Sequence, residues 1–175
     1  GLAEKIVVKR RWVHRVSDSV PLDQAALIEP LSVGFHAVQR SGASAGDIAL
    51  ITGAGPIGLL TAAVCRAEGI STIISEPSSL RRRKAVDADV ADHVLDPTTD
   101  DVVGRVRELT GGRGADVGFE CTSVQPALDT LFDALKPTGV LVVVSIWGHP
   151  GSVEMQKLVL KEIDMRGTIA YVNNL

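Results

Sequence analysis

The sequence of 175 residues has few aromatic side chains and no excess of positive charge, and both shortages argue against certain functions. Aromatic residues make up 3% of the chain, which leaves few rings on which nucleic-acid bases could stack. The formal net charge is −3, so no overall positive field attracts nucleic acid or an anionic membrane. The chain also lacks a run of about 18 apolar residues and a signal-peptide pattern. We therefore expect neither nucleic acid nor a membrane as a partner.

Cysteine is also scarce, because Cys65 and Cys121 are the only two in the chain. They lie far apart and form no CxxC pair, which argues against both a disulfide framework and a zinc knuckle. We interpret them as reduced thiols of the core in a cytoplasmic protein, since disulfides are rare in that compartment.

What the chain does contain, from Asp47 onward, is a regular alternation of short apolar runs with helical patterns. This alternation is typical of a doubly wound α/β fold, with six parallel strands in the order 3-2-1-4-5-6. The segment Gly1 to Val16 differs, because it alternates like a pair of strands, which cannot form a stable unit alone. The strands after Asp47 are expected at residues 48–52, 71–75, 93–95, 115–121, 140–146 and 168–172.

The first of these strands runs into the motif Gly53-Ala54-Gly55-Pro56-Ile57-Gly58, a GxGxxG loop that opens a helix. In this context the first glycine permits a tight turn and the second lets the backbone approach a pyrophosphate. The third glycine brings the helix close to the sheet, and the helix N-terminus supplies N–H groups to the phosphates. A turn without a ligand is the alternative, and the placement favours dinucleotide binding.

An acidic residue, Glu76, closes the second strand 18 residues after Gly58, near the position where a carboxylate binds the adenosine ribose. A carboxylate there accepts hydrogen bonds from the ribose hydroxyls and repels a 2′-phosphate, which favours NAD over NADP. The basic run Arg81-Arg82-Arg83-Lys84 is an opposing signal, since a cation could receive that phosphate. Basic runs usually face solvent, so we assign only Arg81 to the cofactor, next to the adenine.

Four stretches together resemble the zinc-dependent medium-chain dehydrogenases, and most closely the branch of sorbitol and butanediol dehydrogenases. The likeness covers essentially the whole chain, and it is specific, because several separate motifs occur in the order and spacing of that family. The stretches are A-L-I-E-P-L-S-V-G-F-H-A-V, G-A-G-P-I-G-L-L, F-E-C-T and K-E-I-D-M-R-G-T-I-A-Y-V.

The resemblance implies an NAD-dependent oxidation of a secondary alcohol, either a diol such as 2,3-butanediol or a sugar alcohol. It implies a Rossmann domain at residues 31–175 and, at residues 1–30, a remnant of a β-rich, GroES-like catalytic domain. It further implies a homodimer or homotetramer. Two alternatives remain open: a zinc-free relative of the quinone reductase type, and a nucleotide-sensing domain that is not an enzyme.

In the family that this chain resembles, the glutamate that matches Glu29 is a ligand of the catalytic zinc. The remaining zinc ligands would precede Gly1, so we expect no catalytic residue in this chain, no activity of the chain alone, and zinc only in a longer parent. His36 lies seven residues further on, which is about 10.5 Å along a helix and too far for zinc bonds of about 2 Å. A glutamate paired to a lysine, or simply hydrated, is the alternative.

The resemblance also assigns contacts with the cofactor. The glycine loop would hold the pyrophosphate, Glu76 the ribose, and the remaining positions would lie beside the nicotinamide half. The assigned residues are Val33, Gly53, Gly55, Pro56, Ile57, Gly58, Glu76, Cys121, Thr122, Ser145, Ile146, Trp147, Tyr171 and Val172.

Overall fold

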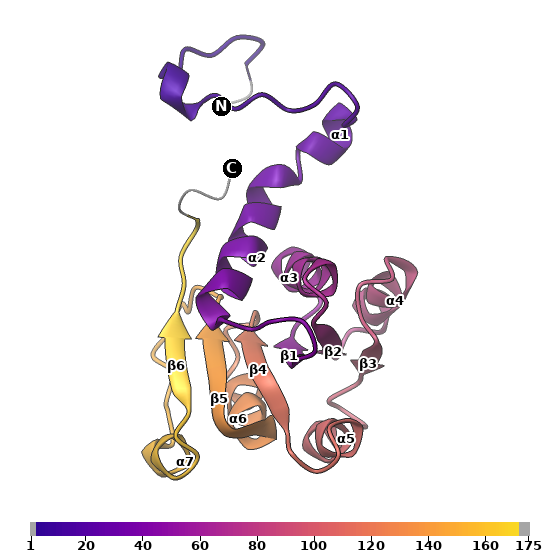
Figure 1. Cartoon of the computed structure of the whole chain (residues 1–175), viewed down its shortest axis with the longest axis vertical. Helices are drawn as coiled ribbons and strands as arrows, with labels where there is room; N and C mark the ends of the chain where they lie inside the picture. Colours follow the sequence, from indigo (N-terminus) through magenta and orange to yellow (C-terminus); the bar gives the residue numbers. More distant parts are fainter. Residues whose placement is uncertain (1–2, 172–175) are drawn as a thin grey trace.

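A computed structural model describes residues 3–171, and its centre is a sheet of six parallel strands (Figure 1). The strands are β1 (Ile48–Thr52), β2 (Ser71–Ser75), β3 (His93–Leu95), β4 (Ala115–Glu120), β5 (Leu135–Val143) and β6 (Asp164–Gly167). Their order across the sheet is β3-β2-β1-β4-β5-β6, and each neighbouring pair is parallel. The predicted doubly wound α/β fold and strand order are therefore confirmed.

The helices are η1 (Arg10–Trp12), α1 (Leu22–Ala25), α2 (Ile28–Ser41), α3 (Pro56–Ala67), α4 (Ser79–Asp87), α5 (Val102–Leu109), α6 (Gln125–Ala134) and α7 (Met155–Leu160). Those from α2 onward form a layer on each face of the sheet, whereas η1 and α1 lie apart from it (Figure 1). One buried cluster joins α2, α3 and α4 to the sheet through small residues such as Ala37 and Ala62. A second cluster joins α5 and α6 to the opposite face through Val106, Leu131 and Phe132.

The fifth strand ends earlier than the sequence predicts. The expected strand covers residues 140–146, whereas β5 ends at Val143. The N–H groups of Val144 and Ser145 both donate to one carbonyl oxygen, that of Glu120, at 2.9 and 3.1 Å. Because two consecutive residues share one acceptor, the chain leaves the ladder there and turns across the end of β4.

The prediction of the sixth strand at residues 168–172 is wrong for its described part. Strand β6 covers Asp164–Gly167, in register with residues 140–143 of β5. Residues 168–171 have no strand structure, and Val172 lies outside the described residues. The pattern of Ile169 and Tyr171 is strand-like, but β5 has already turned away and offers no further partner.

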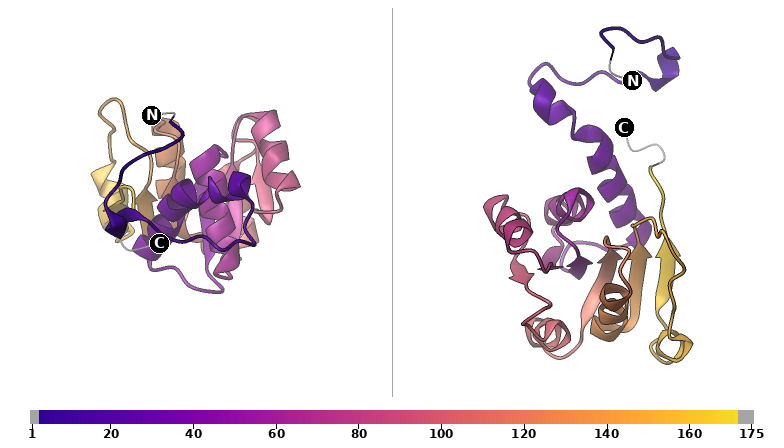
Figure 2. Two further views of the ribbon diagram at one scale, coloured as in Figure 1. Left: turned by 90° about the horizontal axis from the view of Figure 1, so that it is seen from above. Right: turned by 180° about the vertical axis from the view of Figure 1, so that it is seen from behind.

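The segment before α1 lies beyond the N-terminal end of α2, away from the sheet (Figures 1 and 2). The predicted strand pair is wrong here, since η1 is the only helix or strand within residues 3–16. Its apolar side chains are exposed, with Val7 at 100% and Trp12 at 62%. A two-stranded unit needs a further strand or an apolar surface to pack against, and Val7 and Trp12 remain largely exposed within the described chain. No helix in the described range is long and apolar enough to cross a membrane.

Candidate cofactor-binding site

The glycine loop joins β1 to α3 and has the shape that its sequence predicts. Gly53 has a φ of +91°, which favours glycine, and its N–H donates to the carbonyl of Ser75 at 2.8 Å. A Cβ on Gly58 would lie 2.0 Å from the carbonyl oxygen of Gly53, so the helix can approach the loop only without a side chain. A Cβ on Gly55 would meet no atom within 4 Å. The second glycine therefore faces open space, as a site for pyrophosphate requires.

The N-terminus of α3 points into this open space at the carboxyl end of β1. Pro56 is its first residue, and no side chain caps the turn before it. Proline at this position costs no hydrogen bond, because the first N–H groups of a helix lack partners within the helix. The following N–H groups and the positive end of the helix dipole are therefore available to an anion.

Glu76 follows β2 directly and is buried, with 2% of its surface exposed. One carboxylate oxygen accepts a hydrogen bond from the Ala54 N–H and the other from the Ser78 N–H, each at 2.8 Å. A carboxylate has about four acceptor positions, so positions are left for other donors. Glu76 thus holds the glycine loop against the end of β2, a role that the sequence does not reveal.

Two of the four basic residues that follow, Arg81 and Arg82, have different roles. Arg82 donates to the carbonyls of Glu76 and Pro77 at 2.8 and 2.7 Å and pairs with Asp96 at 2.7 Å. It therefore anchors the loop between β2 and α4. The side chain of Arg81 is 59% exposed and its guanidinium lies 3.9 Å from the Glu76 carboxylate. Arg81, the arginine assigned to the cofactor, is thus placed beside the acidic end of β2.

The carboxyl ends of β4 and β5 come together around Glu120, which is completely buried. Its two oxygens accept five hydrogen bonds, from the N–H and hydroxyl of Thr122, the Ser123 N–H, the Ser145 hydroxyl and the Trp147 indole. Burial raises the pKa of Glu120, but these hydrogen bonds outweigh it, and the net pKa is lower than usual. The carboxylate is therefore ionised at neutral pH.

Sequence reasoning missed Glu120. The stretch F-E-C-T places an acidic residue at the end of an apolar strand, as S-E-P does for Glu76. An acidic residue directly after an apolar run is therefore the sequence signal that could have identified Glu120. The partners Ser145 and Trp147 lie 25 and 27 residues further along the chain, so no local rule identifies them.

Thr122, Ser145 and Trp147, three of the predicted nicotinamide-side residues, bind this carboxylate. Cys121 donates its N–H to the Thr52 carbonyl at 3.2 Å, which ties the turn after β4 to β1. A Cβ on Gly53 would lie 2.9 Å from the Thr122 methyl group, so the turn also packs on the glycine loop. Burial, followed by the negative charge of Glu120, raises the pKa of the Cys121 thiol. Cys121 is therefore neutral at physiological pH and serves as a packing residue.

The structure brings most of the predicted cofactor residues to one end of the sheet, where β1, β2, β4 and β5 have their carboxyl ends. Val33, on α2, and Ile57, on α3, pack against the first core cluster. Ile146 is 78% exposed at this end of the sheet. Tyr171 lies after β6 and is half-buried, and Val172 is outside the described residues.

The zinc ligand predicted at Glu29 lies in the first turn of α2, where its side chain is exposed. Among residues 3–171, no group of three His, Cys, Asp or Glu side chains is arranged to hold a metal ion. His36 lies on the same helix and is half-buried. The donor set around Glu29 therefore does not fit a zinc ion.

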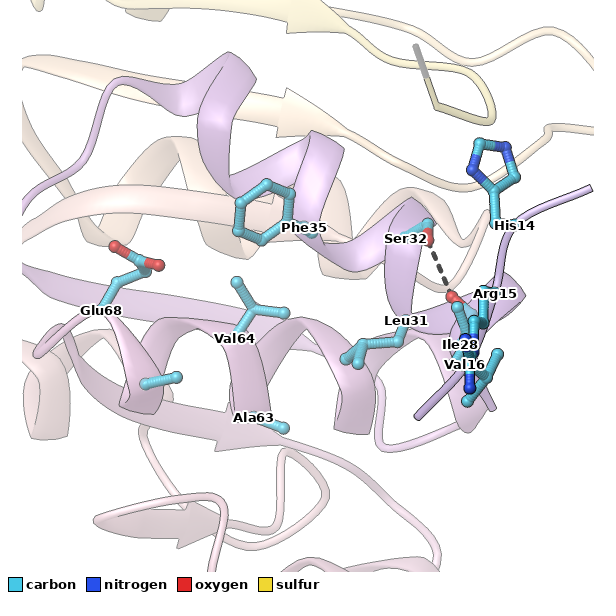
Figure 3. Close-up of a pocket in the computed structure, with 11 residues that line it drawn as sticks. His14, Arg15, Val16, Ile28, Leu31, Ser32, Phe35, Ala63, Val64 and Glu68 are labelled. Atoms are coloured by element: carbon cyan, nitrogen blue, oxygen red, sulfur yellow. Dashed lines mark hydrogen bonds between the residues drawn. The ribbon is translucent and has the colours of Figure 1, made fainter. Parts of the chain in front are cut away.

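A separate apolar groove of about 540 Å³ lies between α2, α3 and residues 14–16 (Figure 3). Phe35 of α2 and Val64 of α3 line it, with Leu31 one turn nearer the N-terminus of α2. None of the residues assigned to the cofactor lines this groove. It lies against the helices, whereas the glycine loop lies at the strand ends, so it is distinct from the dinucleotide site.

A parallel six-stranded sheet, a glycine loop at its centre and an acid at the end of the next strand define a Rossmann-type dinucleotide-binding domain. Residues 56–174 match the model of the zinc-binding dehydrogenase family. The chain belongs to that family.

Individual relatives agree with this assignment. The chain is 63% identical to an (R,R)-butanediol dehydrogenase of Neisseria gonorrhoeae, over 99% of this chain and 49% of the relative. The crystal structure of 2R,3R-butanediol dehydrogenase from Bacillus subtilis has 35% identity and a TM-score of 0.84, over 90% of this chain and 45% of that one. A zinc-binding dehydrogenase of Sinorhizobium meliloti 1021, solved with NADP, has 30% identity and a TM-score of 0.76, over 83% and 44%. The chain thus spans about half the length of the relatives it matches.

Proposed function

We propose that this chain is the NAD-binding part of an alcohol dehydrogenase that oxidises a secondary alcohol, a diol such as 2,3-butanediol or a sugar alcohol. The observation that carries the proposal is the open cradle at Gly55, next to the uncapped N-terminus of α3. The diol is supported by the high identity to the butanediol dehydrogenase of Neisseria gonorrhoeae. Residues 31–175 would form the nucleotide-binding domain.

Each half of the cofactor would have its own group of residues. Gly53, Gly55, Pro56, Ile57 and Gly58 would hold the pyrophosphate, because backbone N–H groups and a helix dipole suit its charge. Glu76 would accept hydrogen bonds from the ribose hydroxyls, with Arg81 beside the adenine.

At the other end, NAD would supply the hydride acceptor for the oxidation of the alcohol, and the chain's task is to orient the nicotinamide ring. The residues that would line this end are Val33, Cys121, Thr122, Ser145, Ile146, Trp147, Tyr171 and Val172.

Preference for NAD over NADP is part of this proposal. The buried charge of Glu76 would repel a 2′-phosphate, since like charges brought together at an interface cost several kcal/mol. Arg82, which donates to the loop backbone, is already paired with Asp96 and two carbonyls. It is therefore not free to receive a phosphate, which supports NAD.

We also propose that the protein assembles through the outer edge of β6. That strand ends the sheet, and an unpaired edge is able to pair with a second copy across a two-fold axis. Met165 of this strand is exposed, as are Val159 and Leu160 of α7, which precedes it in the chain, and Ile169, which follows it. A homodimer is the simplest assembly that covers them. The cytoplasm is the proposed location, because Cys65 and Cys121 are both free thiols.

The test is to titrate the 175-residue chain with NADH and with NADPH while recording nicotinamide fluorescence. We expect saturable binding of NADH, and NADPH binding at least about tenfold weaker, which corresponds to 1.4 kcal/mol. Equal or tighter binding of NADPH would contradict the NAD preference. Absence of binding to both nucleotides would contradict the proposal as a whole.

A further inference from the structure

We propose that Glu120 is a positioning residue, which holds the ends of β4 and β5 in the arrangement that receives the nicotinamide half of the cofactor. This inference rests on the proposed function. Its side chain need not touch the cofactor, because it acts through the residues that it binds.

The hydrogen bonds of Glu120 link two loops that lie far apart in the sequence. One oxygen accepts from the turn after β4, through the Thr122 N–H at 2.6 Å, the Thr122 hydroxyl at 2.6 Å and the Ser123 N–H at 2.8 Å. The other accepts from the segment after β5, through the Ser145 hydroxyl and through the Trp147 indole N–H at 2.9 Å. One carboxylate therefore joins the two loops that carry most of the predicted nicotinamide contacts.

The turn after β4 is held in a conformation that a residue other than glycine rarely adopts. Ser123 has a φ of +59°, in the left-handed region. Its N–H donates to Glu120 and also to the Ser145 hydroxyl at 3.1 Å, and its hydroxyl donates to the Ile146 carbonyl at 3.1 Å. Backbone strain of this kind persists where the surroundings over-determine it, and such positions cluster at functional sites.

The same strand carries an acid with a simpler environment at its other end. Asp116, near the start of β4, accepts from the Ile48 N–H at 2.8 Å and pairs with Lys136 at 2.6 Å. It ties β1, β4 and β5 together at the end of the sheet opposite the glycine loop. Asp116 is therefore a matched control: a partly buried, hydrogen-bonded carboxylate on β4 that does not adjoin the cofactor site.

A glutamine at position 120 is nearly isosteric but cannot accept on both sides. If its oxygen faces the turn after β4, its NH₂ group faces the Trp147 indole N–H, and two donors are then opposed. The bond to Trp147 is lost, so the segment after β5 is held less firmly while the turn after β4 keeps its acceptor. Glu120→Gln should therefore disturb the nicotinamide end more than the adenosine end.

The experiment compares two ligands in a Trp12→Phe background, where Trp147 is the only tryptophan. NADH reports on the whole cofactor, and ADP-ribose reports on the adenosine and pyrophosphate alone. For Glu120→Gln we expect NADH affinity to fall roughly tenfold, because NADH must then order the loosened segment after β5 when it binds, with ADP-ribose affinity within about twofold. Trp147 emission should shift to the red, and energy transfer from Trp147 to NADH should decrease.

Asp116→Asn is the control, and it should lower stability while weakening NADH and ADP-ribose to the same small degree. Ser123→Ala is the second variant in case Glu120→Gln does not fold, as judged by circular dichroism. It removes only the bond to Ile146, and we expect NADH to bind a few-fold more weakly with ADP-ribose unchanged.

The outcomes separate the two hypotheses. If the unsubstituted chain binds neither ligand, the proposed function is wrong and the positioning role falls with it. If the chain binds both ligands, but Glu120→Gln and Ser123→Ala weaken both equally or neither, the positioning role alone is wrong.

Discussion

The carboxylate of Glu76 accepts a hydrogen bond of 2.8 Å from the backbone N–H of Ala54, which lies 22 residues earlier in the chain. This bond connects the end of β2 to the middle of the glycine loop. The other carboxylate oxygen accepts from the Ser78 N–H, so the loop before α4 is held by the same side chain. The residue proposed to select the cofactor is therefore also the residue that holds the cofactor loop.

We predict that Glu76→Gln lowers the free energy of unfolding by about 1–3 kcal/mol, the cost of an unsatisfied buried donor. A glutamine has one acceptor oxygen, so its NH₂ must face one of the two backbone N–H groups. The preference for NADH over NADPH should also narrow, because the negative charge is lost. Urea unfolding and paired titrations measure both effects. Glu68→Gln, at an exposed position, is the control and should change stability by less than about 0.5 kcal/mol.

Two glycines of the loop should respond to alanine in opposite ways. Gly58→Ala should cost about 3 kcal/mol of stability, because its Cβ would lie 2.0 Å from a backbone oxygen. Gly55→Ala should leave stability within about 1 kcal/mol and reduce NADH affinity at least tenfold, since the methyl group would occupy the open approach to the pyrophosphate. Thermal unfolding and NADH titration of both variants test this. Normal NADH binding by Gly55→Ala would show that the pyrophosphate lies elsewhere.

The contribution of Glu120 to stability should depend on pH with a defined sign. Its folded-state pKa is lower than usual, because hydrogen bonds to the carboxylate outweigh the effect of burial. A carboxyl group of this kind stabilises the fold above its unfolded pKa of about 4.3, and this contribution is lost as pH falls through the lower folded pKa. Glu120→Gln should therefore cost about 2–3 kcal/mol at pH 7, and the difference should shrink below about pH 4. Urea unfolding of both proteins at several pH values measures it, and a difference that grew toward acid pH would contradict the assignment.

The proposed assembly predicts different results for two exposed apolar residues. Met165→Arg, on the edge strand β6, should yield a monomer, because it places a charge on the edge that would pair with a second copy. Leu80→Arg, on α4 near the other edge of the sheet, should leave the assembly unchanged. Met165 is 38% exposed and Leu80 is 56% exposed, so neither change disturbs the core. Light scattering over a range of concentrations distinguishes the outcomes, and a monomer of the unsubstituted chain at high concentration would contradict the proposal.

The sequence by itself determined the class of the fold and the location of its cofactor loop. Short apolar runs that alternate with helical patterns indicate a parallel sheet covered by helices. The sequence shows this because the apolar patterns of strands and of helices are both local properties of the chain. The GxGxxG loop was also readable, since its three glycines serve backbone geometry within a few residues, and Gly58 confirms this by its contact with Gly53. The position of Glu76 at the end of β2 was predicted from its spacing of 18 residues after Gly58.

Only the tertiary structure decided where strands end and what the second buried acid binds. Strand β6 ends at Gly167 because β5 turns away after Val143, and the apolar pattern of residues 168–171 cannot supply the missing partner. Glu120 gains its role from Ser145 and Trp147, which no spacing rule connects to it. A hydrogen-bond ladder or a buried carboxylate is satisfied by groups distant in the chain, so such features are decided only when the sheet has formed.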